Sequence, residues 1–125
     1  MMSVKKILVA DDEEDILALT TIALRQEGYE VATAKNGAEA VAKTAEFLPD
    51  VLLLDVMMPI LDGYHAAHHI MHDPALTKKP KIILMTIRDS AREEKLMTFS
   101  GAAGMLQKPF GMASLKSLVA QIAAS

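Results

Sequence analysis

Five short apolar segments, separated by helical patterns, constrain the fold of this chain more than any other feature. They cover residues 6–10, 29–34, 51–54, 82–85 and 105–107. A strand with one face in water alternates apolar and polar residues, whereas these segments have few polar interruptions, as expected of strands buried on both faces. The pattern therefore predicts a parallel sheet with helices on both sides.

The segments between these strands have the signals of helices. Acidic residues open a predicted helix over about 13–27. Asn36 is placed to cap the next helix, and Glu39 is placed to reach back to it. Further helices are expected over about 63–72 and 92–100, and at the end of the chain. Right-handed crossovers turn this order into a doubly wound (βα)5 sandwich, which is an α/β fold.

Two of these helices have an apolar face that can be read from residue spacing. The predicted buried face of the second helix consists of Ala38, Val41, Ala42 and Ala45. That of the last helix consists of Leu115, Leu118, Val119 and Ile122.

The length of 125 residues predicts a single domain over 1–125. The chain has no Cys, which excludes a disulfide framework and Cys-ligated zinc and fits a reducing compartment. No segment of the sequence fits a signal peptide or a membrane span, so we expect a cytoplasmic protein. Residues 1–62 contain 12 Asp/Glu and 5 Lys/Arg, hence −7, whereas residues 63–125 contain 4 and 8, hence +4. The acidic first half favours a cation site over binding of nucleic acid.

Polar side chains stand where the predicted strands end. Asp11 and Asp12 follow the first strand, Asp55 the third, Thr86 the fourth and Lys108 the fifth. Ligands of such sheets bind beyond the carboxyl ends of the strands, so these residues are expected to share one site. Two carboxylates about 5 Å apart repel by roughly 3 kcal/mol at an effective dielectric of about 20, and Mg²⁺ is the natural cation to offset this. With a hydroxyl and an ammonium nearby, the site suits phosphoryl transfer with Asp55 as the attacking carboxylate.

Five motifs, in this order, resemble those of the receiver domain of two-component response regulators. They are Ile7-Leu8-Val9-Ala10-Asp11-Asp12-Glu13, Leu53-Leu54-Asp55-Val56-Met57-Met58-Pro59, Asp62-Gly63, Thr86, and Lys108-Pro109-Phe110. The resemblance covers essentially the whole chain. It implies a stand-alone, CheY-like receiver with a flavodoxin-like fold and five parallel strands in the order 2-1-3-4-5.

By this resemblance, Asp55 accepts a phosphoryl group from a histidine kinase or a phosphotransfer protein in a Mg²⁺-dependent reaction. Asp12 and Asp55 would bind Mg²⁺ directly, together with the backbone carbonyl of Met57, while Asp11 would act mostly through water. The hydroxyl of Thr86 and the ammonium after the fifth strand would hold the phosphoryl oxygens.

The resemblance also implies a cis peptide bond at the site and a surface through which the domain contacts its target. Lys108 would precede Pro109 through a cis peptide bond, which only X-Pro bonds adopt at low cost. The readout would be the face formed by the fourth helix, the fifth strand and the fifth helix. The domain would catalyse only its own phosphotransfer and dephosphorylation. It would act on an unknown protein target, as a monomer or a phosphorylation-dependent dimer, without direct binding to nucleic acid or insertion into a membrane.

Four positions are expected to tune this switch. Met105 stands where the family usually has an aromatic residue, and its flexible side chain serves either in switching or only in the core. Ile87 follows Thr86 where the family usually has Ala or Gly, and its branched side chain would narrow the approach of water to the phosphoryl group. Met57 and Arg88 occupy two further positions that tune the lifetime of the phosphoryl group across the family.

Four histidines lie in the predicted third helix, namely His65, His68, His69 and His72. Two pairs of them have the i, i+4 spacing that can chelate a transition metal. Without a nearby Cys or a placed carboxylate, we interpret the four as a solvent-facing histidine face.

Two other functions are considered. One is an aspartate-nucleophile phosphohydrolase, an enzyme class that generally has a second acid two residues after the nucleophile. This chain has Met57 at that position, which argues against such an enzyme. A receiver-fold scaffold that binds partners without phosphorylation is favoured by Met105 and Ile87. The intact acceptor aspartate, threonine and lysine argue against such a scaffold.

Overall fold

The computed structural model describes residues 5–87 and 91–125, in which strands and helices alternate along the chain. The strands are β1 (Lys6–Ala10), β2 (Glu30–Ala34), β3 (Val51–Asp55), β4 (Lys81–Thr86) and β5 (Gly104–Gln107). The helices are α1 (Glu14–Gln26), α2 (Gly37–Phe47), α3 (Gly63–Met71), α4 (Ala91–Ser100) and α5 (Met112–Ala124). Within the described ranges, no helix is long and apolar enough to cross a membrane.

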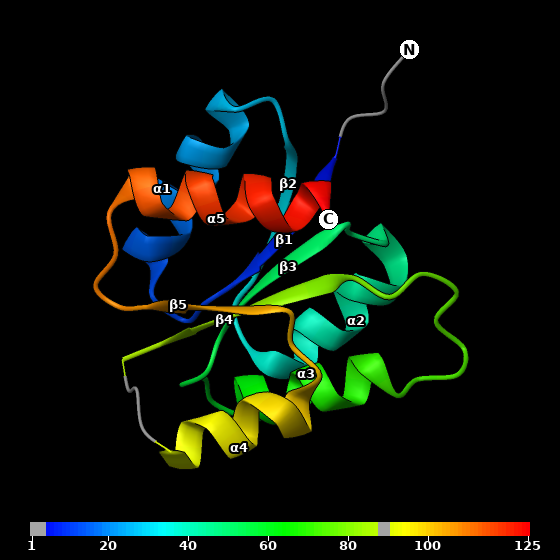
Figure 1. Ribbon diagram of the computed structural model, residues 1–125. Coiled ribbons are helices and arrows are strands. Elements are labelled where there is room, and N and C mark those ends of the chain that lie inside the picture. The colour runs from blue at the N-terminus through cyan, green and yellow to red at the C-terminus, as the bar shows by residue number, and fades with distance from the viewer. Residues whose placement is uncertain (1–4, 88–90) are drawn as a thin grey trace.

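The strands form one parallel sheet in the order β2-β1-β3-β4-β5, which confirms the predicted fold. Helices α1 and α5 cover one face of the sheet, and α2, α3 and α4 cover the other (Figure 1). The register pairs Asp55 with Met85 and Thr86 with Gln107, so the carboxyl ends of the central strands meet at one edge.

The core consists of two apolar layers, one on each face of the sheet. Side chains alternate between the layers along β3, where Leu52 and Leu54 face α2, α3 and α4, and Val51 and Leu53 face α1 and α5. All four are fully buried. Burial on both faces explains why this strand lacks polar alternation, and each such side chain contributes about 1.5–3 kcal/mol to folding.

The apolar face predicted for α2 is the buried one only at Val41. Ala38, Ala42 and Ala45 are exposed, while Val41 is partly buried. The side that faces the core instead consists of Gly37, Ala40 and Thr44. A Cβ on Gly37 would lie 2.0 Å from the carbonyl oxygen of Leu61, so this close approach of two backbones sets the rotation of the helix. Alanine is small enough for either side of a helix, which is why its spacing misidentified the face.

The predictions for the cap of α2 and for the apolar face of α5 agree better with the structure. The side chain of Asn36 accepts a hydrogen bond of 2.8 Å from the backbone N–H of Glu39, which confirms the predicted cap. The carboxylate of Glu39 lies 3.1 Å from Nζ of Lys43. In α5, Leu115 and Val119 are buried, and the other two residues of its predicted apolar face pack against the same core layer.

Candidate functional site

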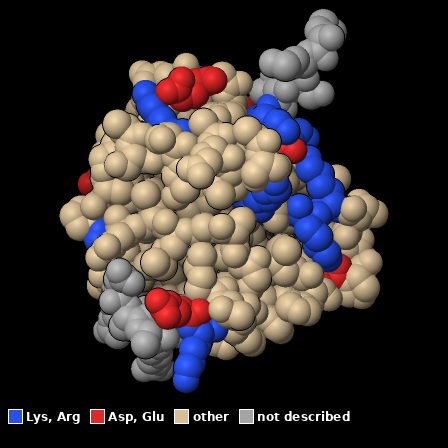
Figure 2. All heavy atoms as spheres, in the orientation of Figure 1, with Lys and Arg blue, Asp and Glu red and all other residues tan. Residues whose placement is uncertain are grey.

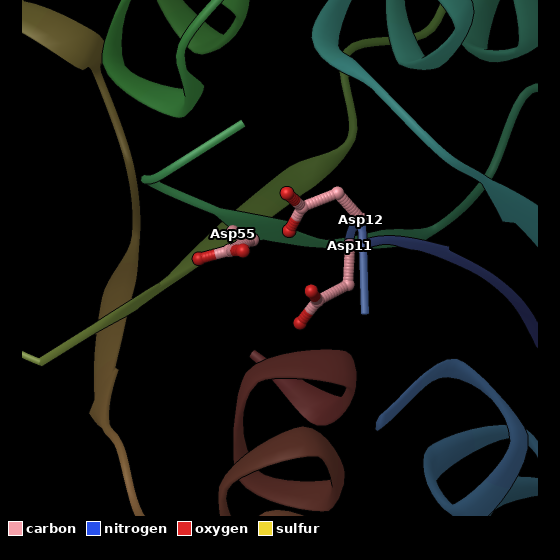
Figure 3. A group of neighbouring side chains, drawn as sticks. All are labelled: Asp11, Asp12 and Asp55. Atoms are coloured by element: carbon pink, nitrogen blue, oxygen red, sulfur yellow. The ribbon is translucent and has the colours of Figure 1, made fainter. Parts of the chain in front are cut away.

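Three aspartates converge at the carboxyl edge of the sheet. Asp11 directly follows β1, Asp12 comes next, and Asp55 is the last residue of β3. One oxygen from each carboxylate lies within 4.8 Å of the others, and the side chains of Asp11 and Asp12 extend toward Asp55 (Figure 3). Asp11 is fully buried and Asp55 is 3% exposed, whereas Asp12 is open to solvent.

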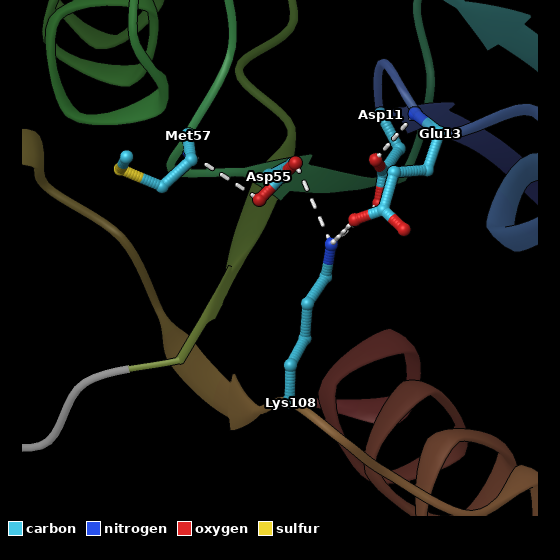
Figure 4. Close-up of polar contacts among 5 residues, drawn as sticks. All are labelled: Asp11, Glu13, Asp55, Met57 and Lys108. Carbon is cyan, nitrogen blue, oxygen red and sulfur yellow. Dashed lines mark hydrogen bonds and ion pairs between the residues drawn. The ribbon is translucent and has the colours of Figure 1, made fainter.

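The ammonium of Lys108 reaches into this group from the end of β5 (Figure 4). Its Nζ lies 2.9 Å from Oδ2 of Asp11, 3.5 Å from Oδ2 of Asp55 and 3.6 Å from Oε1 of Glu13. The backbone N–H of Lys108 donates a hydrogen bond of 2.7 Å to the carbonyl of Thr86, which ties the ends of β4 and β5 together. The peptide bond between Lys108 and Pro109 is cis, as the resemblance implies.

Backbone groups hold the two buried carboxylates in place. Oδ1 of Asp11 accepts a hydrogen bond of 3.0 Å from the N–H of Glu13, and Oδ1 of Asp55 accepts one of 3.3 Å from the N–H of Met57. The start of α3 lies against the end of β3, since a Cβ on Gly63 would lie 2.3 Å from the carbonyl oxygen of Asp55. The loop between β3 and α3 is therefore packed tightly around the central carboxylate.

The electrostatics of the site oppose the charge on Asp55. Burial and the neighbouring Asp11 carboxylate raise the pKa of Asp55, and Lys108 and the N–H of Met57 offset only part of this, so that the pKa is about 7. Burial alone would lower the pKa of Lys108, but its hydrogen bond to Asp11 and the surrounding carboxylates raise it overall. The site thus holds more negative charge than its single ammonium balances, which suits the binding of a cation.

The carboxylates open into a cleft of about 720 Å³. Asp12, Asp55 and Lys108 form its polar part, and Met57 and Ile87 contribute to an apolar rim. The side chains of Met57 and Ile87 are 64% and 60% exposed. These two side chains therefore border the cleft that contains Asp55.

The structure places most of the predicted site residues in or beside this cleft. Thr86, at the end of β4, is 3% exposed. Met105 is half-buried on β5, opposite Leu84 in the register. Arg88 lies outside the described residues.

Two acids of this site were missed as functional candidates. Glu13 contributes a carboxylate near Lys108, and Asp62 lines the cleft while its side chain caps α3 through the N–H of His65. The signal for both was present in the sequence, because each lies at the start of a predicted helix that follows a strand end.

The interpretation of the histidines is wrong at two points. His65, His69 and His72 are exposed, but His68 is half-buried against Phe99 of α4. A placed carboxylate also exists, because Oδ2 of Asp62 lies 2.6 Å from Nδ1 of His65. The sequence could not show either contact, since the first depends on how α3 and α4 pack and the second on the cap geometry.

Comparison with known proteins identifies the family. The family model described as "Response regulator receiver domain" matches residues 7–120. The alkaline phosphatase synthesis transcriptional regulatory protein PhoP of Bacillus subtilis is 36% identical over 118 residues, which are 94% of this chain and 48% of that protein. The chain spans about half the length, or less, of the curated relatives that it matches.

Solved structures agree with this result. The chemotaxis protein CheY4 of Vibrio cholerae is 29% identical with a TM-score of 0.88, covering 96% of this chain and 99% of that chain. The receiver domain of the sensor histidine kinase PA1611 of Pseudomonas aeruginosa is 26% identical with a TM-score of 0.86, covering 98% and 100%. That structure has a magnesium ion coordinated in its active-site cleft. With its fold, its clustered aspartates and its match over residues 7–120, this chain belongs to the response regulator receiver domain family.

Proposed function

We propose that the protein is a phosphorylation switch in which Asp55 accepts a phosphoryl group from a histidine kinase or a phosphotransfer protein. The observation that carries this proposal is the convergence of three carboxylates and one ammonium on a single cleft. Asp55 is held at the centre of that group and opens into the cleft. A receiver that acts through partner proteins is the form of the switch that we propose for this chain.

The residues present fit a Mg²⁺ ion. Asp11, Asp12 and Asp55 offer hard oxygen ligands, and the backbone carbonyl of Met57 would complete the set. The raised pKa of Asp55 supports this assignment, because a bound cation would stabilise the charged form that burial and Asp11 disfavour. When bound, the ion would neutralise charge on the transferring phosphoryl group.

The chemistry that we propose is an in-line transfer. A carboxylate oxygen of Asp55 attacks phosphorus as the bond from phosphorus to the donor's histidine nitrogen breaks, and that nitrogen keeps the electron pair of the broken bond. Lys108 would pair with a phosphoryl oxygen, and the hydroxyl of Thr86 would donate a hydrogen bond to another. Hydrolysis by water later restores the carboxylate and releases phosphate.

The output that we propose is the face of α4, β5 and α5. Lys108 stands directly after β5, so a change in its partners at the site acts on the strand that carries Met105. Dimerisation through the same face is tested by measuring molecular mass in solution with and without beryllofluoride, a mimic of the phosphoryl group.

Phosphorylation is tested directly with a small phosphodonor. The protein is incubated with acetyl phosphate and Mg²⁺, and its intact mass is measured beside that of Asp55→Asn. We expect one added phosphoryl group that needs Mg²⁺ and is absent from the variant. Asp50→Asn, the same change at the other end of β3, is the matched control and should still be labelled. If neither acetyl phosphate nor beryllofluoride bound to the folded protein, the phosphorylation-independent scaffold would replace this proposal.

A further inference from the structure

The exposed side of α3 carries imidazole rings that the phosphoacceptor chemistry does not use. The ring of His68 stacks on Phe99 of the neighbouring helix α4, with centroids 4.2 Å apart and planes inclined by 6°. The ring of His72 lies one turn further along α3, with its centroid 4.1 Å from that of His68. Helices α3 and α4 lie side by side, so this stack joins the two helices (Figure 1).

Backbone carbonyls fix which nitrogen of each ring faces outward. Nδ1 of His68 lies 3.0 Å from the carbonyl oxygen of Phe99, and Nδ1 of His72 lies 2.9 Å from the carbonyl oxygen of His68. A carbonyl oxygen can only accept, so each Nδ1 carries the hydrogen. In the neutral ring, Nε2 then holds the free lone pair. Histidines that bind metals commonly have this arrangement, with the other ring nitrogen donating to a carbonyl or a carboxylate.

We propose that His68 and His72 form a binding site for a divalent first-row transition metal ion of the Zn²⁺, Ni²⁺ and Cu²⁺ class. Their Nε2 atoms supply two imidazole ligands from adjacent turns of one helix, and water completes the coordination. Imidazole suits these ions, whereas the carboxylate site at the end of β3 suits Mg²⁺. The two sites therefore select different metals by ligand chemistry.

The other pair at the same spacing is arranged differently. Nδ1 of His65 is bound to the Asp62 carboxylate at 2.6 Å, and its ring meets Phe99 edge-on at 5.5 Å. His69 is exposed and has no ring partner among the described residues. His68 and His72 differ from this pair because their rings are in contact and each Nδ1 is bound to a backbone carbonyl. Each Nε2 is left without a partner among the described residues, so we assign the site to these two histidines.

Metal binding would also affect α4. Ligation turns both Nε2 atoms toward one ion and restrains the His68 ring that packs on Phe99. Because α4 belongs to the proposed output face, the metal would bias the position of that face. This consequence alone depends on the proposed function, while the metal site itself does not.

The site is tested by titrating Zn²⁺ into the protein in the presence of saturating Mg²⁺, which keeps the carboxylates occupied. Heat of binding gives the stoichiometry and Kd, and NMR follows the signals of the imidazoles and of the Phe99 ring. We expect one ion per chain, shifts of the His68, His72 and Phe99 signals, and a Kd weakened at least about tenfold in His68→Gln and His72→Gln. His69→Gln is the matched control on the same helix and should bind as the wild type does.

Three results would overturn the proposal. One is the absence of saturable Zn²⁺ binding under these conditions. A second is an equal loss of affinity in His69→Gln, which would indicate an adventitious histidine surface. A third is binding that Asp55→Asn abolishes, which would place the ion among the carboxylates. Thermal unfolding of each variant checks that it remains folded, and none of these readouts requires phosphorylation.

Discussion

Strand β3 has an aspartate at each end, and the two aspartates are in opposite electrostatic situations. Asp50, directly before the strand, accepts a hydrogen bond of 2.7 Å from the backbone N–H of Lys6 and lies 2.8 Å from Nζ of Lys78. Burial alone would raise the pKa of Asp50, but these bonds and the nearby lysines lower it overall. Asp55, at the other end, is buried beside another carboxylate, and its pKa is raised to about 7.

The difference follows from how helices are oriented on a parallel sheet. Their carboxyl ends all lie at the edge where the strands begin, and lysines occupy this edge. Nζ of Lys6 donates to the carbonyl of Phe47 at 3.2 Å, and Nζ of Lys78 donates to that of Leu48 at 3.1 Å, both at the end of α2. Figure 2 shows lysines gathered on the side of the molecule that holds the loop before β4. The edge where the strands end has the acids instead, so an aspartate stabilises the fold at one edge and belongs to the proposed binding site at the other.

The largest expected effect concerns the packing of α3 against the end of β3 that carries Asp55. Gly63→Ala would place a Cβ 2.3 Å from the carbonyl oxygen of Asp55 and 2.8 Å from Cα of Val56. Neither backbone atom can move without shifting the end of β3, so we expect a loss of about 3 kcal/mol in the free energy of unfolding. Urea denaturation measures it. Gly111→Ala is the control, since a Cβ there meets nothing within 4 Å, and an equal loss in both variants would contradict this account.

The second prediction concerns Asp55→Asn, which removes the buried charge that lies beside the Asp11 carboxylate. A carboxyl group whose pKa is raised to about 7 binds a proton more tightly in the folded chain than in the unfolded one. In Mg²⁺-free buffer, the ionisation of Asp55 therefore lowers the free energy of unfolding. This destabilisation is absent below pH about 4, grows as the pH rises, and is complete above pH about 7. We expect Asp55→Asn to stabilise the protein by about 2 kcal/mol at about pH 8, which is less than full linkage because the cleft admits solvent.

Thermal or urea unfolding across this pH range, without Mg²⁺, measures the effect. The gain should shrink toward acid pH, where the wild-type carboxyl is already neutral. A gain that stayed constant with pH would mean that the variant acts through packing instead of charge.

The third prediction concerns the other end of β3 and has the opposite sign. Asp50→Asn weakens a charged hydrogen bond to the start of β1, and we expect a loss of about 1 kcal/mol near neutral pH. A lowered pKa means that the stabilisation is present above the unfolded-state value of about 3.9 and is lost as the pH falls through the folded-state value. Denaturant unfolding between about pH 3 and pH 7 measures this slope.

Lys78→Met serves as the control for this third variant. It removes the partly exposed ion pair and the exposed hydrogen bond from Nζ of Lys78 to the carbonyl of Leu48, and should cost at most about 0.5 kcal/mol. If Lys78→Met cost as much as Asp50→Asn, the contacts of the Lys78 side chain would be the source of the stabilisation, and the bond from the Lys6 backbone would contribute little.

The fold could be predicted because it depends on patterns within short segments. Strands buried on both faces have no alternation to misread, and their order along the chain with right-handed crossovers leaves few topologies. The face of α2 could not be predicted, because it depends on the contact between Gly37 and the backbone at Leu61, a residue 24 positions away in sequence. Such contacts between distant backbones leave no signal in the spacing of alanines.

The site could be predicted because strand ends in a parallel sheet meet at one edge. That rule alone brings Asp11, Asp55 and Lys108 together, whatever the side-chain detail. The pairing of His68 with Phe99 could not be predicted, because it arises from the packing of α3 on α4 and from a hydrogen bond to a backbone carbonyl. Charge clusters follow from topology, whereas ring stacks depend on how two helices pack.

The smallest expected effect concerns access to the Asp55 end of β3. Ile87 is 60% exposed on the rim of the cleft. We propose that its branched side chain restricts the path of water to a phosphorylated Asp55. We expect Ile87→Ala to shorten the lifetime of the phosphorylated state by about twofold to fivefold, a change of less than about 1 kcal/mol in the barrier to hydrolysis. The loss of added mass after removal of the phosphodonor measures the rate. Ile22→Ala is the control, because Ile22 is 56% exposed on α1 and does not line the cleft, so only the change at the rim should speed hydrolysis. An unchanged rate in Ile87→Ala would show that the polar groups around Asp55, and not the apolar rim, set the lifetime.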